Sequence, residues 1–195
     1  MLICIPGVNP QGTMQNSWQS DNHCLSNLSL KLLYLHAELF HSHHGLLEEY
    51  VQSLFDEGIV NDQFSQIQTL KSMEQPDLVV QLIDAYLVDV EMILSELTSY
   101  SDFPDVDFSK VTLLAHKVKD RSSCIGAEHV RLACDELIQA SVQMNKQNFV
   151  RALSWIKKEF SCTQDKLESY AQMERRIIRL ESRQKGKACT PTNSA

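Results

Sequence analysis

The chain has 195 residues, of which 43% are hydrophobic and 22% are charged, and its formal net charge is −7. This length suits one compact domain with additional terminal segments, and the hydrophobic fraction is large enough to build a buried core. A general nucleic-acid binder would be basic, so the acidic balance argues against that class and favours a protein or small-molecule partner.

Cysteine spacing and the length of apolar runs indicate the cellular compartment in which the protein works. The 6 cysteines include no CxxC pair, which argues against a zinc finger or redox motif and fits free thiols in a reducing environment. Residues 1–12 lack the basic start of a secretory signal, and no apolar run reaches the roughly 18 residues that span a bilayer. We therefore expect a soluble intracellular protein without membrane or nucleic-acid contacts.

The first part of the chain is rich in Asn, Ser, Gln and Gly. We expect residues 1–45 to form a poorly ordered extension, in which the apolar stretch 28–40 could form a short helix. His41, His43 and His44 raise the alternative of a metal site. Zinc sites normally need a fourth ligand and a rigid frame, and since neither is visible we expect no bound metal.

Residues 46–183 have a helical pattern almost throughout and form the predicted domain, whereas residues 184–195 are predicted to be a disordered tail. Gly58 can end a first helix, whose apolar face consists of Leu47, Tyr50, Val51 and Leu54. Asn61 or Asp62 can cap a second, short helix, which carries Phe64, Ile67 and Leu70.

Four longer helices are expected after these two. Pro76 can open the first of them, since the first turn of a helix tolerates proline. The next begins near Phe108 and ends at Gly126, and a short loop at residues 145–148 separates the last two. Apolar residues at alternating steps of four and three mark one face of three of these helices: Val79, Ile83, Tyr86, Val90, Ile93, Leu97 and Tyr100; Val130, Ala133, Leu137, Ala140 and Met144; Phe149, Leu153, Ile156, Phe160, Thr163, Leu167 and Tyr170.

Four long helices with short connections predict an all-α fold, an antiparallel four-helix bundle, with the two short helices covering one end. No strand-like alternation competes with this pattern. No Gly-rich phosphate loop is present, so the sequence offers no ATP or dinucleotide site.

The chemistry of the chain is expected to lie around His116. Val111, Ala115 and Val118 share the apolar face of their helix, and His116 lies about 100° around the axis from Ala115, at an edge that solvent can reach. Lys119 follows one turn later on the same side. The neutral ring nitrogen of an exposed imidazole can take up a phosphoryl group, and the lysine would offset part of the added charge. The spacing alone favours a polar boundary histidine without a chemical role.

Residues 116–127 read HKVKDRSSCIGA. This segment resembles the phospho-acceptor signature of plant histidine-containing phosphotransfer (HPt) proteins, which runs approximately HQFKGSSSSIGA. The resemblance extends over about residues 46–183, including Tyr50 to Gly58 and the Val106-Asp-Phe108 segment. The positions that match within the signature are His116, Lys119, Ser122, Ser123, Ile125, Gly126 and Ala127.

The resemblance implies an HPt fold and a phosphohistidine carrier without kinase activity of its own. His116 would accept phosphate from the receiver domain of a hybrid sensor histidine kinase and pass it to a response regulator, as in cytokinin signalling. The receiver domain would supply Mg²⁺, so the chain would need no cofactor. Family members act in cytoplasm and nucleus, and we expect a monomer that exposes its docking face.

Three positions depart from the signature. Asp120 replaces a glycine that lets the receiver approach closely, Arg121 replaces serine, and Lys117 replaces glutamine. Asp120 adds bulk and negative charge where phosphate arrives, although it could also hydrogen-bond the imidazole, and Arg121 could restore the local charge balance. With Ser123, these residues are predicted to modulate the docking surface.

Three hypotheses follow. The first is a working carrier that is slowed by Asp120. The second is an interaction protein of the pseudo-HPt type, which binds receiver domains and competes with active carriers. The third, an unrelated helical scaffold, is disfavoured by the signature, and retention of His116 argues for the carrier over the pseudo-HPt protein.

Overall fold

The computed structural model describes residues 38, 42–72 and 74–188. The chain divides into two compact units, Met1–Ser42 and His43–Ala195, and the fold below is that of the second unit. Most of the apolar stretch at residues 28–40, as well as His41, lies outside the described residues, so the structure does not test those predictions.

A helix over residues 42–56 opens the described fold, and the turn after it contains Gly58 with a φ of +70°. Leu47 and Leu54 are buried, as the predicted apolar face requires. The short helix α2 (Asp62–Gln68) follows, and the side chain of Asn61 caps it by accepting a 3.0 Å hydrogen bond from the Gln63 N–H. The cap satisfies one of the N–H groups that a helix start leaves without an intrahelical partner.

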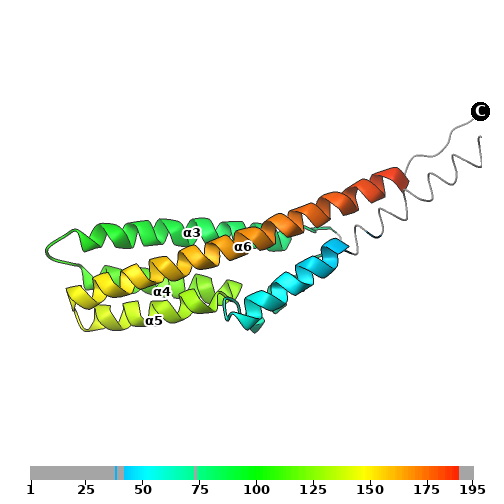
Figure 1. The fold of residues 1–195 in the computed structure, drawn as a ribbon. Coiled ribbons are helices and arrows are strands. Elements are labelled where there is room, and N and C mark those ends of the chain that lie inside the picture. Colours follow the sequence, from blue (N-terminus) through cyan, green and yellow to red (C-terminus); the bar gives the residue numbers. More distant parts are fainter. Residues whose placement is uncertain (1–37, 39–41, 73, 189–195) are drawn as a thin grey trace, which may run out of the picture. The chain divides into compact units, whose positions relative to one another are not determined.

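Four longer helices form the bundle: α3 (Leu78–Ser101), α4 (Phe108–Ile125), α5 (Glu128–Val142) and α6 (Lys146–Ala188). They pack in a closed ring in which each helix contacts the next along the chain, and α6 contacts α3 (Figure 1). The predicted apolar stripes of α3, α5 and α6 supply a large part of the buried core, and residues of the first two helices and of α4 supply much of the rest. Within the described residues there is no strand, only an isolated bridge between Val60 and Ala127. The predicted all-α four-helix bundle is confirmed.

Two predicted core positions are wrong. Leu70 lies beyond the end of α2 and is 51% exposed, because the chain leaves the helix after only two turns. Met144 lies in the α5–α6 turn with a φ of +52°, so it is 75% exposed and does not continue the α5 stripe.

Several predicted boundaries also shift. α3 begins at Leu78 with Asp77 as its N-cap residue, so Pro76 precedes the helix and does not open it. α6 begins at Lys146, inside the predicted loop at residues 145–148. At its other end α6 continues through Gly186 to Ala188.

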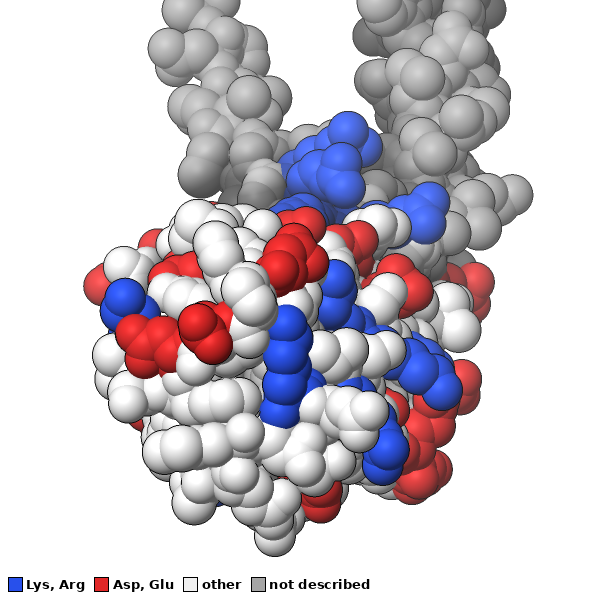
Figure 2. Space-filling model, turned by 90° about the vertical axis from the view of Figure 1, so that its left-hand side faces the viewer, with Lys and Arg blue, Asp and Glu red and all other residues white. Residues whose placement is uncertain are grey.

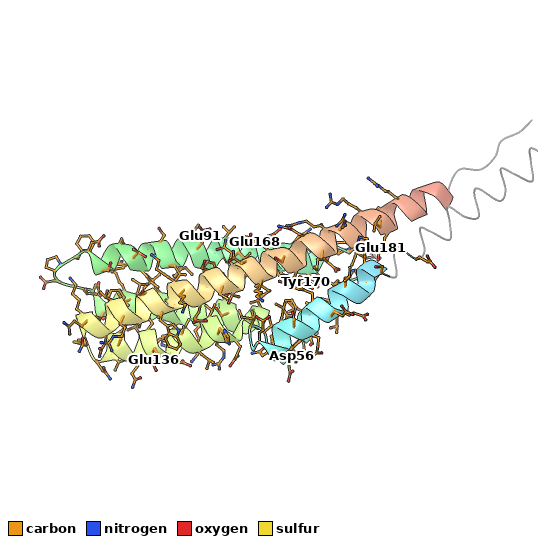
Figure 3. All side chains as sticks on the ribbon, viewed as in Figure 1. Asp56, Glu91, Glu136, Glu168, Tyr170 and Glu181 are labelled. Atoms are coloured by element: carbon orange, nitrogen blue, oxygen red, sulfur yellow. The ribbon has the colours of Figure 1, made fainter. Side chains whose placement is uncertain are left out.

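The helix over residues 42–56 and α2 pack on the second half of α6. The ring of Phe64 meets that of Tyr170 edge to face at 5.2 Å, and the Tyr50 hydroxyl donates a 3.0 Å hydrogen bond to the Lys166 carbonyl. Tyr170, which is labelled in Figure 3, belongs to α6. Glu174 is 2% exposed and forms an ion pair with Lys71, which compensates the buried charge. These contacts hold the two short helices in place over one end of the bundle, as the sequence predicted.

The opposite end of the bundle, where α3 joins α4 and α5 joins α6, carries acidic and basic side chains interspersed among uncharged ones (Figure 2). The ammonium of Lys146 donates to the Phe103 carbonyl at 2.6 Å and ties the two connections together. In the described part of the chain, no helix combines the length and the apolar character that crossing a membrane requires.

Candidate functional site

The ends of α4 are fixed by side-chain and backbone hydrogen bonds. At its start, Asp107 accepts a 3.2 Å hydrogen bond from the backbone N–H of Lys110. This bond holds the pKa of the exposed Asp107 carboxyl below its ordinary value. At its end, Gly126 adopts a left-handed conformation with a φ of +83°, and the N–H groups of Gly126 and Ala127 both reach the Ser122 carbonyl at 2.9 Å. A pair of hydrogen bonds to one carbonyl oxygen is a common C-terminal cap of helices that end at a glycine.

Gly126 is required by its neighbours as well as by its backbone conformation. A Cβ atom at this position would lie 2.6 Å from the backbone nitrogen of Phe64 and 2.9 Å from Oδ1 of Asn61. The Asn61 N–H donates to the Gly126 carbonyl at 3.0 Å, and the Glu128 N–H donates to the Ile59 carbonyl at 3.0 Å. The glycine of the signature therefore serves to join the α4–α5 turn to the start of α2.

Ser122, another signature residue, is also structural. Its side chain is fully buried, and its hydroxyl lies 3.1 Å from the hydroxyl of Tyr86 on α3. A buried hydroxyl is costly unless it finds a partner, and each of these two satisfies the other. Ser122 and Gly126 thus belong to the frame that supports the site.

His116 stands on the exposed side of α4. The core face of the helix is formed by Val111, Ala115 and Val118, all fully buried, whereas His116 is exposed. Among the described residues, none forms a hydrogen bond or an ion pair with its ring. The predicted accessibility of His116 is confirmed. The hydrogen bond from the imidazole to Asp120 that the sequence allowed is not formed among the described residues.

Lys119 is engaged by the neighbouring helix. Its Nζ lies 2.5 Å from Oδ1 of Asp135 on α5, and the second carboxylate oxygen of Asp135 lies 3.7 Å from Nη1 of Arg131. Arg131 in turn holds both carboxylate oxygens of Glu128, at 2.9 and 2.6 Å. A row of alternating charges along α5 therefore ends at the lysine that the sequence places beside His116.

The same row reaches the start of α2, where the amide of Asn61 donates to Glu128 at 2.7 Å. The hydrogen bond from Arg131, with a smaller contribution from Asn61, lowers the pKa of Glu128, and burial opposes this only in part. Glu128 thus stays ionised and keeps Arg131 in place.

The other predicted site residues differ in their surroundings. Arg121 points to α3, where its Nη2 lies 3.4 Å from Asp89, so it does not balance the charge of Asp120 as predicted. The Ser123 hydroxyl donates to the Lys119 carbonyl at 2.8 Å, within its own helix. Lys117 and Asp120 are exposed, and in the described part of the chain neither has a hydrogen-bond or ion-pair partner.

Exposed apolar side chains border these charges. Leu113, three residues before His116 on α4, is 59% exposed. Val88 and Met92 on α3, one and three residues from the Asp89 that binds Arg121, are also exposed. A face of this kind, with a reactive polar group among apolar side chains, suits docking of another protein.

Within the described residues no three His, Cys, Asp or Glu side chains are placed to hold a metal ion. The metal alternative involving His41, His43 and His44 rests in part on His41, which is outside the described residues. His44 lies 3.7 Å from Glu181 of α6. His129, which follows the signature, faces α6, with its Nδ1 3.4 Å from Glu159.

No family model matches the chain. Curated proteins do: histidine-containing phosphotransfer protein 1 of Arabidopsis thaliana is 36% identical over 132 residues, which cover 68% of this chain and 86% of that relative. The chain belongs to the plant histidine-containing phosphotransfer family. The rice protein of the same name is 29% identical over 131 residues, covering 67% of this chain and 89% of the relative.

Solved HPt structures share the fold. A histidine-containing phosphotransfer protein from rice superposes with a TM-score of 0.68 at 25% identity, covering 71% of this chain and 98% of that structure. One from maize gives a TM-score of 0.66 at 30% identity, with 69% and 99% covered. The family and the fold inferred from the signature are both confirmed.

HPt relatives of two kinds match this chain. Pseudo histidine-containing phosphotransfer protein 6 of Arabidopsis thaliana is 29% identical over 127 residues, covering 65% of this chain and 82% of the relative. The chain is therefore similar both to HPt proteins and to pseudo-HPt proteins, so the choice between carrier and pseudo-HPt protein depends on the residues of the site itself.

Asp135 is the site residue that sequence reasoning missed. It lies on α5, outside the signature, and its position opposite Lys119 depends on how the two helices are rotated and shifted against each other. A sequence signal does exist in hindsight: Arg131 and Asp135 stand four residues apart, the spacing of an ion pair on a helix surface.

Proposed function

We propose that this HPt protein is a phosphohistidine carrier in a two-component phosphorelay. His116 takes phosphate from the receiver domain of a hybrid sensor histidine kinase and donates it to a response regulator, in signalling of the cytokinin type. The observation that carries the proposal is the exposed ring of His116, which no described side chain caps and which has the exposed Leu113 one turn before it on α4. A buried or capped imidazole would have no route to a second protein's active site.

The transfer needs only one nucleophile from this chain. The lone pair of the unprotonated ring nitrogen forms the new P–N bond, while the P–O bond to the receiver's aspartate breaks and its electron pair returns to that carboxylate. The ring keeps its proton on the other nitrogen. The receiver supplies Mg²⁺ for charge stabilisation, so this chain acts as a carrier without its own ATP site or cofactor.

A pseudo-HPt interaction protein is the second candidate. Asp120 favours it, because an exposed and unpaired carboxylate one turn from His116 opposes an incoming phosphoryl group and the acidic pocket of a receiver. Such a protein would bind receiver domains through the same face and occupy them without moving much phosphate.

Incubation with a phosphorylated receiver domain distinguishes the two. A carrier takes up label that is acid-labile and alkali-stable, and His116→Gln removes this label while leaving receiver binding intact. Binding of the receiver without any label on the chain would support the pseudo-HPt protein and contradict the carrier.

As part of the same proposal, the protein is a monomer that works in both cytoplasm and nucleus. Sedimentation of the purified chain tests the first statement, and imaging of a fluorescent fusion in plant cells tests the second. A stable dimer that covers the α4 face, or exclusion from either compartment, would contradict them.

A further inference from the structure

Asp135 holds the lysine that is expected to support the phosphoryl group. The 2.5 Å contact joins its Oδ1 to Lys119 Nζ, and the two side chains keep exposed fractions of 47% and 31%. Both groups are therefore partly solvated and free to exchange partners, unlike a fully buried pair. Lys119 can serve either partner, since it lies one turn from His116 on its own helix and contacts Asp135 of α5.

A second cation lies beside Asp135 and can neutralise its carboxylate. Arg131 lies 3.7 Å from Oδ2 of Asp135 and is held by two hydrogen bonds to Glu128. When Lys119 leaves, the Asp135 carboxylate keeps an arginine beside it. The departure of Lys119 therefore does not leave an isolated carboxylate, and the ion pairs of Arg131 with Asp135 and Glu128 can remain unchanged.

A phosphoryl group on His116 competes for the lysine with an advantage in charge. It carries roughly −1.5 to −2 by analogy with other phosphorylated side chains, against −1 for the carboxylate. Three donors on the ammonium can serve its oxygens. The balance of charge thus favours Asp135 before phosphorylation and the phosphoryl group after it.

We propose that Asp135 is a positioning residue for the phosphotransfer reaction: it holds Lys119 while His116 is unmodified and releases it to the phosphoryl group, so that its charge sets how far phosphate moves onto His116. This inference rests on the proposed carrier function. No proton moves in the exchange, because only the ion-pair partner of the Lys119 ammonium changes. The bonds made and broken are those of the transfer itself, P–N formed and P–O broken.

The test is a double-mutant cycle on the equilibrium between the phosphorylated receiver and phosphorylated protein. Asp135→Asn is expected to shift the partition about three- to tenfold toward phosphohistidine, since it frees Lys119 and removes a negative charge. In a Lys119→Gln chain the same substitution should give a clearly smaller shift, because only direct repulsion remains. Equal shifts in both backgrounds would overturn the inference.

Two further variants control for charge and for the carboxylate itself. Glu136→Gln removes the same charge from the next residue of α5, which has no ion pair with Lys119, and should leave the partition near that of the original chain. Asp135→Glu retains the carboxylate and should restore the original behaviour. A shift in Glu136→Gln as large as that in Asp135→Asn would mean that net charge alone is responsible.

A second readout avoids the receiver altogether. Phosphoramidate, a small-molecule donor, can phosphorylate the full chain, and ³¹P NMR can then follow the titration of the phosphoryl group. A free Lys119 favours the doubly charged phosphoryl group, so Asp135→Asn should lower the pH of its titration midpoint, and Lys119→Gln should cancel that change.

The two readouts separate the inference from the function on which it rests. An NMR change without any transfer from receivers would uphold the Asp135–Lys119 exchange and contradict the carrier. Transfer from receivers that is unchanged in Asp135→Asn, with an unchanged NMR titration, would uphold the carrier and overturn the exchange. Since Asp135 is half exposed on α5, circular dichroism of the variant should match that of the original chain.

Discussion

Gly126 and Phe64 approach so closely that the backbone nitrogen of Phe64 occupies the space where a side chain at position 126 would begin, 2.6 Å from an added Cβ atom. This contact joins the α4–α5 turn, at the end of the helix that carries His116, to the start of α2. It explains in steric terms why a glycine follows α4.

Gly126→Ala should destabilise the protein by about 2–4 kcal/mol, because alanine is strained at a positive φ and its methyl group would displace the backbone of α2. Urea unfolding followed by circular dichroism measures the change. Gly45→Ala is the matched control, since the position is helical and, apart from the adjoining backbone of its own helix, no atom lies within 4 Å of an added Cβ. It should be neutral or stabilising by up to about 1 kcal/mol. Equal stability of the two variants would refute the steric account.

Asp120→Gly should speed phosphate uptake by His116 from a receiver. The substitution removes bulk and a negative charge from the exposed docking face, and a change of about 1 kcal/mol in the barrier corresponds to roughly fivefold in rate. Stopped-flow or quenched assays with a phosphorylated receiver measure it. Asp120→Asn separates the two causes, since it removes the charge and keeps the bulk. An Asp120→Gly variant no faster than the original chain would exclude both causes.

The buried hydroxyl pair of Tyr86 and Ser122 should be coupled. Tyr86→Phe or Ser122→Ala leaves one buried hydroxyl without its partner and should cost about 1–2 kcal/mol of stability. The double variant removes both groups and should cost less than the sum of the two single changes. Denaturant unfolding of the four proteins gives the coupling directly, and strictly additive losses would show that the 3.1 Å contact contributes nothing.

Alkaline pH should destabilise the fold. Burial raises the pKa of Tyr170 from 10.0 to about 12 and that of Cys134 from 9.0 to about 12. Each group keeps its proton in the folded protein at pH values where the unfolded chain has lost it. This stability is complete below pH 9, and above it stability falls by up to about 1.4 kcal/mol per pH unit for each group.

Urea unfolding at a series of pH values from 8 to 11 measures this loss of stability. Tyr170→Phe should make the decline above pH 10 less steep, because phenylalanine has no proton to lose, and Cys134→Ala should do the same from pH 9. The buried hydroxyl of Tyr86, whose pKa burial also raises, should maintain part of the decline above pH 10 in both variants. If stability falls with pH in both variants as steeply as in the original chain, other groups cause the alkaline sensitivity.

The helical stripes could be read from the chain because they are local. A helix repeats every 3.6 residues, so positions such as Val79, Ile83 and Val90 reveal a buried face without any knowledge of what they pack against. The same reasoning placed His116 at the edge of its stripe, and the structure confirms it as exposed. Errors arose at helix ends, where Pro76 and Met144 fit a helical pattern but the chain turns.

The sequence by itself determined the helical bundle, the family and the accessible histidine, because periodicity and a contiguous signature are properties of neighbouring residues. Only the tertiary structure decided that Lys119 faces Asp135, that Arg121 faces Asp89, and that Gly126 abuts Phe64. Those contacts join helices whose relative rotation and axial shift follow from packing of the whole core. No pattern along a single helix specifies that register, so the charges around His116 could be assigned only once the bundle was assembled.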